Sequence, residues 1–558
     1  MSDSFVWKTD RPWPNERLAT AAIIGHTTDT STRLWLRTAR LGEHTLLLYP
    51  LSMEGAESFN ERLKVVPFDD LETLPDEVMT FSFTIPDYAA DTTHIEDITG
   101  LSPLTEYGYA LFGDDNGTGR ILLGQDRKMT FRTMPTTQAS MSFGFYSCHM
   151  PYKKTIFGNT NLVNIEMWDY FTEVLERHQN DDLRFVIGGG DQIYTDGVDS
   201  LNIWAFLNKV MRKEGGELLP TKEDMLSWYR DIYRGYWGFP TLKKVFSSYP
   251  TYMIWDDHEI ADGWGSHKLK KGKSDELDEI VSNWKDKNLS RDEVLTLLDT
   301  MFKAGEQVYN EYQHAHNPET SSKNRYDYHY QVDKSAFYVL DGRGSRNINR
   351  ASNRILGKSQ FKRFKSWLEE LDPEETPYVF IVSAVPIVHL ISVLANADDN
   401  VLADLANLQD DLRDGWEHSL HDKERRALLR ALFDAADRGL KISVLSGDVH
   451  TSAVFKLKDD DTESVIYQLT SSAITYNKPR VLSWLLGRSV ADEGHSDDGY
   501  SFERLALYTD SNFSIVKVDQ KEDRVMFQLY GKQVVADPYE EEEDIPMTHA
   551  ISKIELRF

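Results

Sequence analysis

Five apolar segments, each followed at once by a cluster of polar and ionisable residues, constrain the fold of this chain more than any other feature. The segments are SFGFY, LRFVIG, TYMIW, SAFYVL and KISVL. Their β-branched and aromatic residues are typical of strands that are covered on both faces of a sheet. Open layered sheets bind their ligands just beyond the carboxyl ends of the strands. The pattern therefore predicts an α/β protein in which five clusters, distant in sequence, converge on one crevice.

The clusters that follow these segments share carboxylates, imidazoles, guanidiniums, a thiol and a phenol. They are Tyr146–His149, Gly190–Tyr194, Trp255–Glu259, Asp341–Arg346 and Ser446–His450. Together these groups supply the metal ligands and the acid that a two-metal phosphoesterase needs.

The composition limits the partners of the chain. A formal net charge of −28 opposes binding to nucleic acid and to anionic membranes, so we expect neither as a stable partner. A phosphate substrate then needs local positive charge, which bound metal ions supply. No stretch approaches the roughly 20 apolar residues of a membrane span, and the first residues lack the basic and apolar regions of an export signal. We therefore expect a cytoplasmic protein, and the sequence leaves its oligomeric state open.

The pattern along the chain divides it into parts. Residues 18–135 alternate in short strands separated by turns such as DDNGTG, with no long helical pattern, and this predicts a small β-sandwich. Residues 141–535 alternate strands with amphipathic helices and predict a catalytic α/β domain. Helical insertions are expected near 199–247 and 265–330, beside the crevice. Residues 536–558 are expected to form a tail and a last strand.

Several clusters have an interpretation from the residues themselves. Asp191, at the end of LRFVIG, is placed to bridge two metals with its two oxygens, and Tyr194 can return to the first metal as a phenolate. Asp257 can bind the second metal. His258 can reach a phosphate oxygen or the leaving group, where a positioned acid contributes ~10²–10⁴-fold to the rate. Four ionisable residues directly after TYMIW are awkward as a mere charged loop, because unpaired buried charges are costly.

The remaining clusters offer further ligands and cations. Asp448 and His450 are two residues apart and so point the same way on an extended strand end. Arg343 and Arg346 are two permanent cations for a phosphate, with Asp341 to orient one of them, although a structural ion pair near a turn is an equally good interpretation.

In combination, these blocks resemble the alkaline phosphatase D family of the calcineurin-like and purple-acid-phosphatase-like metallophosphoesterases. SCH, GDQIY, WDDHE, DGRGSR and SGDVH occur in that family's order, and ILGKSQFKRFKSWL and SSAITY are similar to two more of its segments. The resemblance covers most of residues 18–530. It implies a four-layer α/β/β/α core, preceded by a small fibronectin-like β-sandwich, and a mixed centre of ferric iron, Fe(3+), with calcium, Ca(2+).

The resemblance also implies which residues hold each metal. Carried over by motif, the iron ligands are Cys148, Asp191, Tyr194 and His450. The calcium ligands are Asp191, Asp257 and Asp448. Hard carboxylates suit calcium, and a cysteine favours iron over magnesium. His149 departs from the family's pattern and is a rival to Cys148 as ligand, since the ordinary role of a lone cysteine is that of a small buried hydrophobe.

The sequence thus predicts a metal-dependent phosphoester hydrolase, acting on small phosphomonoesters or phosphodiesters. A metal-activated hydroxide is expected to attack phosphorus in line, with His258, Arg343 and Arg346 binding the substrate and assisting catalysis. The alternative from another class is a calcium-binding, non-hydrolytic module of the same fold. Cleavage of nucleic acid is disfavoured by the net charge. The sequence leaves open the choice between monoesters and diesters.

Overall fold

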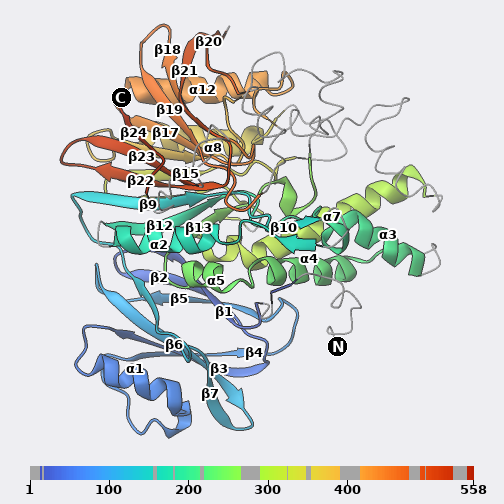
Figure 1. Ribbon diagram of the computed structural model, residues 1–558, viewed down its shortest axis with the longest axis vertical. Helices are drawn as coiled ribbons and strands as arrows, with labels where there is room; N and C mark the ends of the chain where they lie inside the picture. The colour runs from blue at the N-terminus through green and yellow to red at the C-terminus, as the bar shows by residue number, and fades with distance from the viewer. Residues whose placement is uncertain are drawn as a thin grey trace, which may run out of the picture.

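In this computed structural model, the described residues form five β-sheets with helices around them (Figure 1). The structure describes residues 13–14, 18–154, 160–179, 182–213, 219–265, 289–322, 324–346, 354–389, 415–476, 490–496, 498–531 and 549–558. Parts of two predicted features, residues 266–288 of the second insertion and 536–548 of the tail, lie outside the described residues.

The N-terminal strands form two antiparallel sheets that pack face to face. One has the order β1 (Ala21–Thr27), β2 (Ser31–Arg37), β5 (Thr93–Thr99). The other has the order β4 (Met79–Ile85), β3 (Gly42–Pro50), β6 (Glu106–Asp115), β7 (Thr118–Leu123), with β8 (Met129–Arg132) also paired to β6. Alternate residues such as Ile24 and Leu34 pack against Leu46 and Leu111 of the facing sheet. Alternation along each strand therefore fills one shared core.

Helix α1 (Ala56–Val65) was not anticipated in this region. Its buried residues Phe59 and Leu63 pack on the outer face of the five-stranded sheet, against Leu47. They are separated by the helical spacing, but buried Asn60 occupies a position where an apolar residue would have revealed it. The Tyr49 hydroxyl donates a hydrogen bond of 3.1 Å to the side-chain oxygen of Asn60, so this buried oxygen has a partner.

The five predicted strands are all present, and they divide between two larger sheets. The six-stranded sheet has the order β13 (Thr251–Ile254), β12 (Leu183–Gly189), β9 (Ser140–Tyr146), β22 (Asn512–Asp519), β23 (Arg524–Gly531), β24 (Ser552–Leu556). The eight-stranded sheet has the order β14 (Tyr328–Val332), β15 (Ser335–Val339), β16 (Tyr378–Val382), β17 (Lys441–Ser446), β19 (Val465–Thr470), β18 (Ser452–Asp459), β21 (Tyr500–Tyr508), β20 (Glu493–Ser496). A short hairpin pairs β10 (Tyr152–Lys154) with β11 (Thr160–Leu162).

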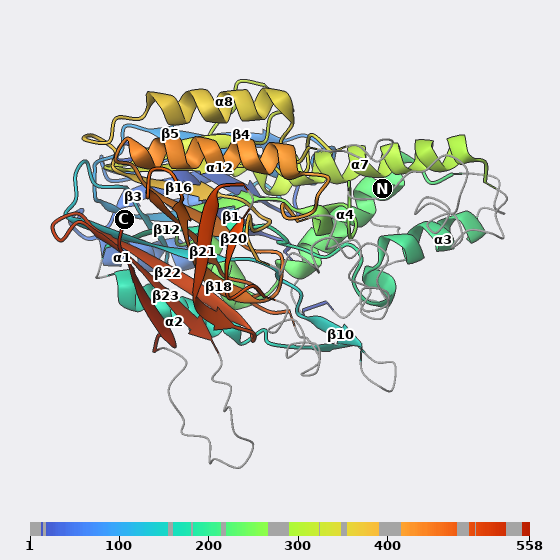
Figure 2. The same cartoon turned by 90° about the horizontal axis from the view of Figure 1, so that it is seen from above.

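Aromatic side chains join these two sheets. The ring of Phe143 on β9 lies 5.3 Å from Phe337 on β15 and 5.1 Å from Phe380 on β16, both edge to face. Helix α2 (Met167–Gln179) covers the outer face of the six-stranded sheet, where Trp168 lies 4.9 Å from Tyr146. Helices α8 (Gly357–Glu370) and α12 (Asp422–Asp437) lie on the outer face of the eight-stranded sheet (Figure 2). The five strands are thus covered on both sides, as their apolar character predicts.

The described parts of the two expected insertions contain helices. The first contains α3 (Ile203–Lys213), α4 (Lys222–Tyr236) and α5 (Pro240–Phe246), and the second contains α7 (Arg291–Tyr312). Helices α4 and α7 each begin with a capping box, at Thr221 and Ser290. Among the described residues, no helix combines the length and the apolar character needed to span a membrane.

Asp91 joins the N-terminal strands to the insertion helices. Its carboxylate accepts hydrogen bonds from Arg37 at 3.3 Å, from Arg234 of α4 at 2.8 Å and from the hydroxyl of Tyr312 of α7. Burial acts to raise the pKa of Asp91, but the two guanidiniums outweigh it and hold the pKa below its usual value. The charge is therefore a stabilising part of the junction.

Replacing Asp91 with asparagine should lower the free energy of unfolding by about 3–5 kcal/mol, because buried Arg37 would keep its charge without a counter-charge. The folded pKa of Asp91 is depressed, so its contribution is complete above about pH 4 and is lost as the pH falls through the folded pKa. Urea unfolding of both proteins, at neutral pH and at about pH 3, measures the difference and its decline in acid.

The matched control is Asp97→Asn, which removes the exposed partner of Arg33 at 2.7 Å. Exposed ion pairs contribute about 0–1 kcal/mol, so this change should cost little. Equal losses in the two variants would contradict the role assigned to Asp91.

Candidate metal centre

Four of the five predicted clusters come together where the two larger sheets meet, and the fifth contacts them through Arg343. Strands β9, β12 and β13 are parallel neighbours in one sheet, and β15, β16 and β17 are parallel neighbours in the other. Parallel strands end at the same edge, so the loops after them face one crevice. Ligand atoms from the loops after β9, β12, β13 and β17 lie within 4.8 Å of one another in overlapping groups. The predicted convergence is confirmed for these four.

The first group combines four different donors. One ligand atom each from Cys148, Asp191 and His450 lies within 4.8 Å of the others. The Cys148 sulfur is 3.3 Å from Asp191 Oδ2. The Tyr194 hydroxyl lies 3.2 Å from Asp191 Oδ2 and 2.8 Å from His450 Nε2. The residues expected to hold the first metal are therefore side by side.

The second group consists of carboxylates and shares Asp191 with the first. Asp191, Asp256, Asp257 and Asp448 place oxygen atoms within 4.8 Å of one another. Asp256, which the sequence reasoning did not single out, is part of this group. Asp191 Oδ1 is buried and has no hydrogen-bond partner among the described residues, an arrangement that requires an explanation in a folded protein. A cation held between the two groups would supply it.

The charges of the site favour a cation as well. Burial raises the pKa of Asp191 well above its usual value, and Asp256 and Asp257 add to this, although His258 opposes it. Burial likewise raises the pKa of the Cys148 thiol and of the Tyr194 phenol. Each of these groups is thus held against ionisation by its surroundings, and a bound cation reverses that preference.

The backbone around these residues is strained. Cys148, Asp191, Asp448 and His450 all have positive φ, at 57°, 54°, 62° and 51°. This left-handed region is uncommon for residues other than glycine, and its cost is typically retained at functional sites. Gly447 shows why the loops bend so sharply: a Cβ atom there would lie 2.5 Å from Ser147. The two sheets approach each other too closely here for a side chain.

The donor types fit a pair of adjacent cations. The first group offers a thiol, a phenol, an imidazole and a carboxylate, the mixture that transition metals accept. The second group offers only carboxylate oxygens, which hard cations prefer. Asp191 belongs to both groups and can give one oxygen to each cation.

His149 is engaged by the protein on both ring nitrogens. The Trp168 indole donates a hydrogen bond of 3.1 Å to His149 Nδ1, so this nitrogen carries no proton. Nε2 then carries the proton and donates to the Tyr236 carbonyl at 3.0 Å. Burial lowers the pKa of His149 to about 4, in agreement with a neutral ring. Of the two rival ligands, the structure places Cys148 in the group and leaves His149 outside it.

His258 lies beside the carboxylates and has a partner of its own. His258 Nδ1 is 2.7 Å from Asp196 Oδ1, and the ring lies 4.0 Å from the ring of Tyr194. Burial lowers the pKa of His258, but Asp196, Asp257 and Asp191 outweigh it and raise the pKa well above 6.5. Sequence reasoning missed Asp196, although its place two residues after Tyr194 was a usable signal.

The two arginines are buried, at 0% and 4% exposure for Arg343 and Arg346. Arg343 forms ion pairs with Asp256 and, at 3.3 Å, with Asp257. Arg346 Nε donates to the Gly342 carbonyl at 2.8 Å. Asp341 accepts from Trp255 and from two backbone amides of its own loop, and so shapes the turn rather than orienting a guanidinium. The sequence allowed two interpretations of Arg343, a phosphate-binding cation or a member of a structural ion pair. Its ion pairs with Asp256 and Asp257 agree with the second interpretation.

Glu259, like Asp196, is a residue whose role only the structure reveals. It accepts hydrogen bonds from the backbone of Gln192 at 2.7 Å and of Asp256 at 2.8 Å. Burial raises its pKa to about 8, against the effect of these bonds. Glu259 therefore ties the loop after β12 to the loop after β13 and fixes the spacing of Asp191 and Asp257.

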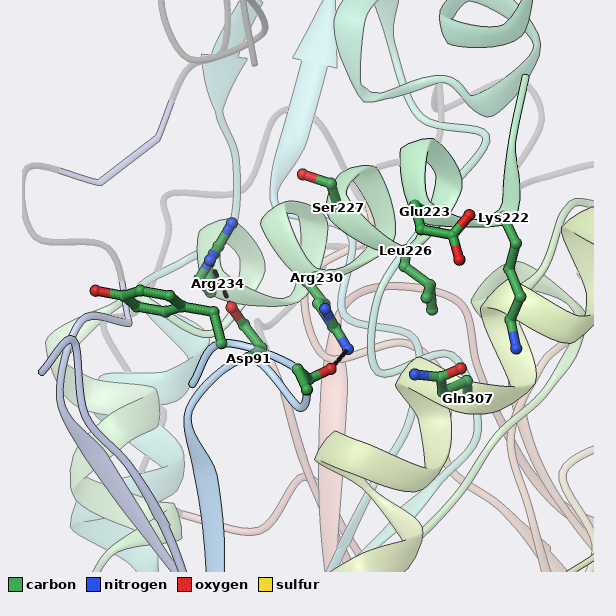
Figure 3. Close-up of a pocket in the computed structure, with 10 residues that line it drawn as sticks. Asp91, Lys222, Glu223, Leu226, Ser227, Arg230, Arg234 and Gln307 are labelled. Atoms are coloured by element: carbon green, nitrogen blue, oxygen red, sulfur yellow. Dashed lines mark hydrogen bonds and ion pairs between the residues drawn. The ribbon is translucent and has the colours of Figure 1, made fainter. Parts of the chain in front are cut away.

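A cavity of about 430 Å³ lies away from this centre, between the loop before β5 and helices α4 and α7 (Figure 3). Its two arginines are already paired with carboxylates: Arg230 with Glu311 at 2.6 Å and Arg234 with Asp91 at 2.8 Å. The charges of these two arginines are therefore balanced within the protein, and Lys222 is the third cation of the lining.

Comparison with known proteins agrees with this geometry. The model of the PhoD-like phosphatase family matches residues 146–525. The chain belongs to the PhoD-like phosphatase family. The match runs from the residue before Ser147 to β23 and includes all the clusters described above. The predicted resemblance to the alkaline phosphatase D family is thereby confirmed.

Individual relatives of this PhoD-like chain are distant. It is 23% identical over 339 residues to an uncharacterized protein of Saccharomyces cerevisiae, YGR266W, which covers 51% of the chain and 47% of the yeast protein. The matched span is thus about half the length of that relative. The structure of PhoD is similar with a TM-score of 0.58 and 14% identity, over 93% of the chain and 87% of PhoD.

A second solved structure has a similar fold. Purple acid phosphatase PPD1 of yellow lupin (Lupinus luteus) matches with a TM-score of 0.50 and 10% identity, over 93% of the PhoD-like chain and 73% of the lupin protein. At these identities the likeness shows the fold, a mixed α/β arrangement with several sheets.

Metal content should distinguish Cys148 from His149. Cys148→Ser should lose metal from the first group with little effect on folding, because the thiol lies among the ligands. His149→Ala should keep its metal but lose about 1–3 kcal/mol of stability, since it leaves the Trp168 indole unpaired. Elemental analysis and urea unfolding measure the two effects. The reverse pattern would make His149 the ligand.

Proposed function

We propose that this protein is a metal-dependent phosphoester hydrolase for small phosphomonoesters or phosphodiesters. The observation that carries the proposal is the buried Asp191, shared by two groups of ligands beside a histidine with its own carboxylate. Two metal sites next to an acid are the arrangement that in-line displacement at phosphorus uses. Membership of the PhoD-like family supports the same conclusion.

The proposed cofactors are ferric iron in the first group and calcium in the second. Iron would be held by Cys148, Asp191, Tyr194 and His450. Calcium would be held by Asp191, Asp257 and Asp448, with Asp256 close by. Such cations, when bound, lower the pKa of water and neutralise charge on phosphoryl oxygens. The donor types support this assignment, because thiolate suits iron and carboxylates suit calcium.

The protein's own residues position the substrate and move protons. Asp196 holds His258 through Nδ1, so Nε2 is the atom left to deliver a proton to the leaving oxygen. The raised pKa of His258 keeps that proton in place at neutral pH. Arg343 holds Asp256 and Asp257 in position, and we retain Arg346 with it as the proposed phosphate-binding cations.

The finer description of the fold is also a proposal. The two facing sheets with outer helices support a four-layer α/β/β/α metallophosphoesterase core. The N-terminal sandwich supports a fibronectin-like domain at 18–135, followed by a catalytic domain at 141–535 and a tail at 536–558.

The alternative, a calcium-binding module without turnover, is not favoured. Such a module needs only the carboxylate group. It gives no reason for a thiol and a phenol beside Asp191, or for the Asp196–His258 pair. Retention of these costly buried groups supports catalysis.

Chelation tests the proposed function directly. The purified protein should hydrolyse nitrophenyl phosphate or bis-nitrophenyl phosphate, lose the activity with its metals, and regain it with calcium, because calcium occupies the exchangeable carboxylate group. Full activity without bound metal would refute a metalloenzyme. A protein that binds both metals but hydrolyses neither ester would support the non-hydrolytic module.

Leaving-group dependence tests His258. His258→Ala should slow the hydrolysis of alkyl phosphates by ~10²–10⁴-fold and that of nitrophenyl esters far less, since a good leaving group needs no proton. Asp196→Asn should show the same pattern, more weakly, because it disturbs only the orientation of the ring. Metal content should stay unchanged in both. Uniform losses accompanied by loss of metal would make His258 a ligand instead.

A further inference from the structure

Ser472 connects two of the loops that carry proposed metal ligands. Its hydroxyl oxygen lies 3.1 Å from the Cys148 sulfur and accepts a hydrogen bond of 3.1 Å from the backbone N–H of His450. Ser472 follows β19 in the eight-stranded sheet, whereas Cys148 follows β9 in the six-stranded sheet. The residue is fully buried. The Ser472 hydroxyl therefore contacts the side chain of one proposed ligand and the backbone of another.

The direction of these hydrogen bonds is set by the donors. The His450 N–H can only donate, so Ser472 Oγ is the acceptor there and its own proton is directed elsewhere. Among the described residues, the other partner of Ser472 Oγ is the Cys148 sulfur. The hydroxyl proton of Ser472 is thus directed at sulfur.

The neighbouring hydroxyl of Ser147 does not duplicate this bond. Its oxygen is 3.3 Å from the Cys148 sulfur, but its one proton is donated to the Ser471 carbonyl at 3.0 Å. A thiolate can only accept hydrogen bonds. Ser472 is therefore the hydroxyl aligned to donate to Cys148 once the thiol is ionised.

Asn512 holds the serine segment in place. Its side chain accepts from Ser452 at 2.8 Å and from Ser471 at 2.9 Å, and it donates to the Ser472 carbonyl at 3.0 Å. The Ser472 N–H in turn donates to Ser452 Oγ at 3.0 Å. Both backbone groups of Ser472 are thus fixed, so its hydroxyl is pre-organised toward the sulfur.

We propose that Ser472 is a positioning residue for the metal centre: its hydroxyl donates to the Cys148 thiolate and its oxygen fixes the His450 loop. The inference rests on the proposed function and extends it to the source of the thiolate's electronic properties. A hydrogen bond to sulfur lowers the energy of its lone pairs, which tunes the metal it binds. Groups that support ligands in this way contribute about 10–100-fold to metal affinity.

The test uses cobalt(II) as a probe in the full-length, metal-stripped protein. Wild type should show a sulfur-to-cobalt charge-transfer band. In Ser472→Ala the band should move to longer wavelength, because the sulfur lone pairs rise in energy, and cobalt affinity should fall about 10–100-fold in competition with a chelator. The matched control is Ser471→Ala, which removes a buried hydroxyl from the adjacent residue. Among the described residues, the partner of that hydroxyl is Asn512, so the band of this variant should stay at the wild-type position.

The outcomes separate this inference from the function on which it rests. A band in Ser472→Ala identical to that of wild type, or shifted equally in Ser471→Ala, would overturn the role of Ser472 while leaving the hydrolase intact. Absence of the band from wild type would overturn the inference together with Cys148 as ligand. Should Ser472→Ala fail to fold, electron–nuclear double-resonance spectra of the cobalt(II) wild-type protein in H₂O and D₂O decide. An exchangeable proton coupled to cobalt through the sulfur supports the hydrogen bond, and its absence refutes the bond.

Discussion

Repulsion among buried carboxylates is the constraint around which the centre of this protein is built. Asp191, Asp256 and Asp257 are buried and Asp448 is half-buried, and the four place oxygens within 4.8 Å of one another. Such an arrangement is unfavourable without compensating positive charge. Part of that charge comes from Arg343, which is paired with Asp256 and Asp257. The rest is what two bound cations would supply, so metal binding and local stability are coupled here.

The two-sheet architecture makes this concentration of charge possible. Asp191 and Cys148 follow strands of the six-stranded sheet, whereas Asp448 and His450 follow a strand of the eight-stranded sheet. Neither sheet holds a complete centre. Contacts such as that of Phe143 with Phe337 and Phe380 fix the position of one sheet against the other. Burial of aromatic surface between the sheets stabilises this packing and opposes the cost of the strained loops and charges at the edge.

Hydrogen bonds around the proposed ligands hold their loops and side chains in place. Glu259 ties two ligand loops together within one sheet, and Ser472 joins loops that come from different sheets. Asp196 fixes one nitrogen of His258 and leaves the other for the reaction. His149 is adjacent to a proposed ligand in sequence, but both of its ring nitrogens form hydrogen bonds within the protein. The role of each of these four residues therefore follows from its hydrogen-bond partners rather than from its residue type.

The sequence by itself determined the strands and the family. Short apolar runs rich in β-branched and aromatic residues, each followed by ionisable residues, predicted the buried strands and a site at their ends, and motif order identified the PhoD-like family. It could not reveal helix α1, because buried Asn60 interrupts its apolar spacing. Nor could it choose between Cys148 and His149, or find Asp196. These depend on distances between residues far apart in the chain, and only the packing of one sheet on the other sets such distances.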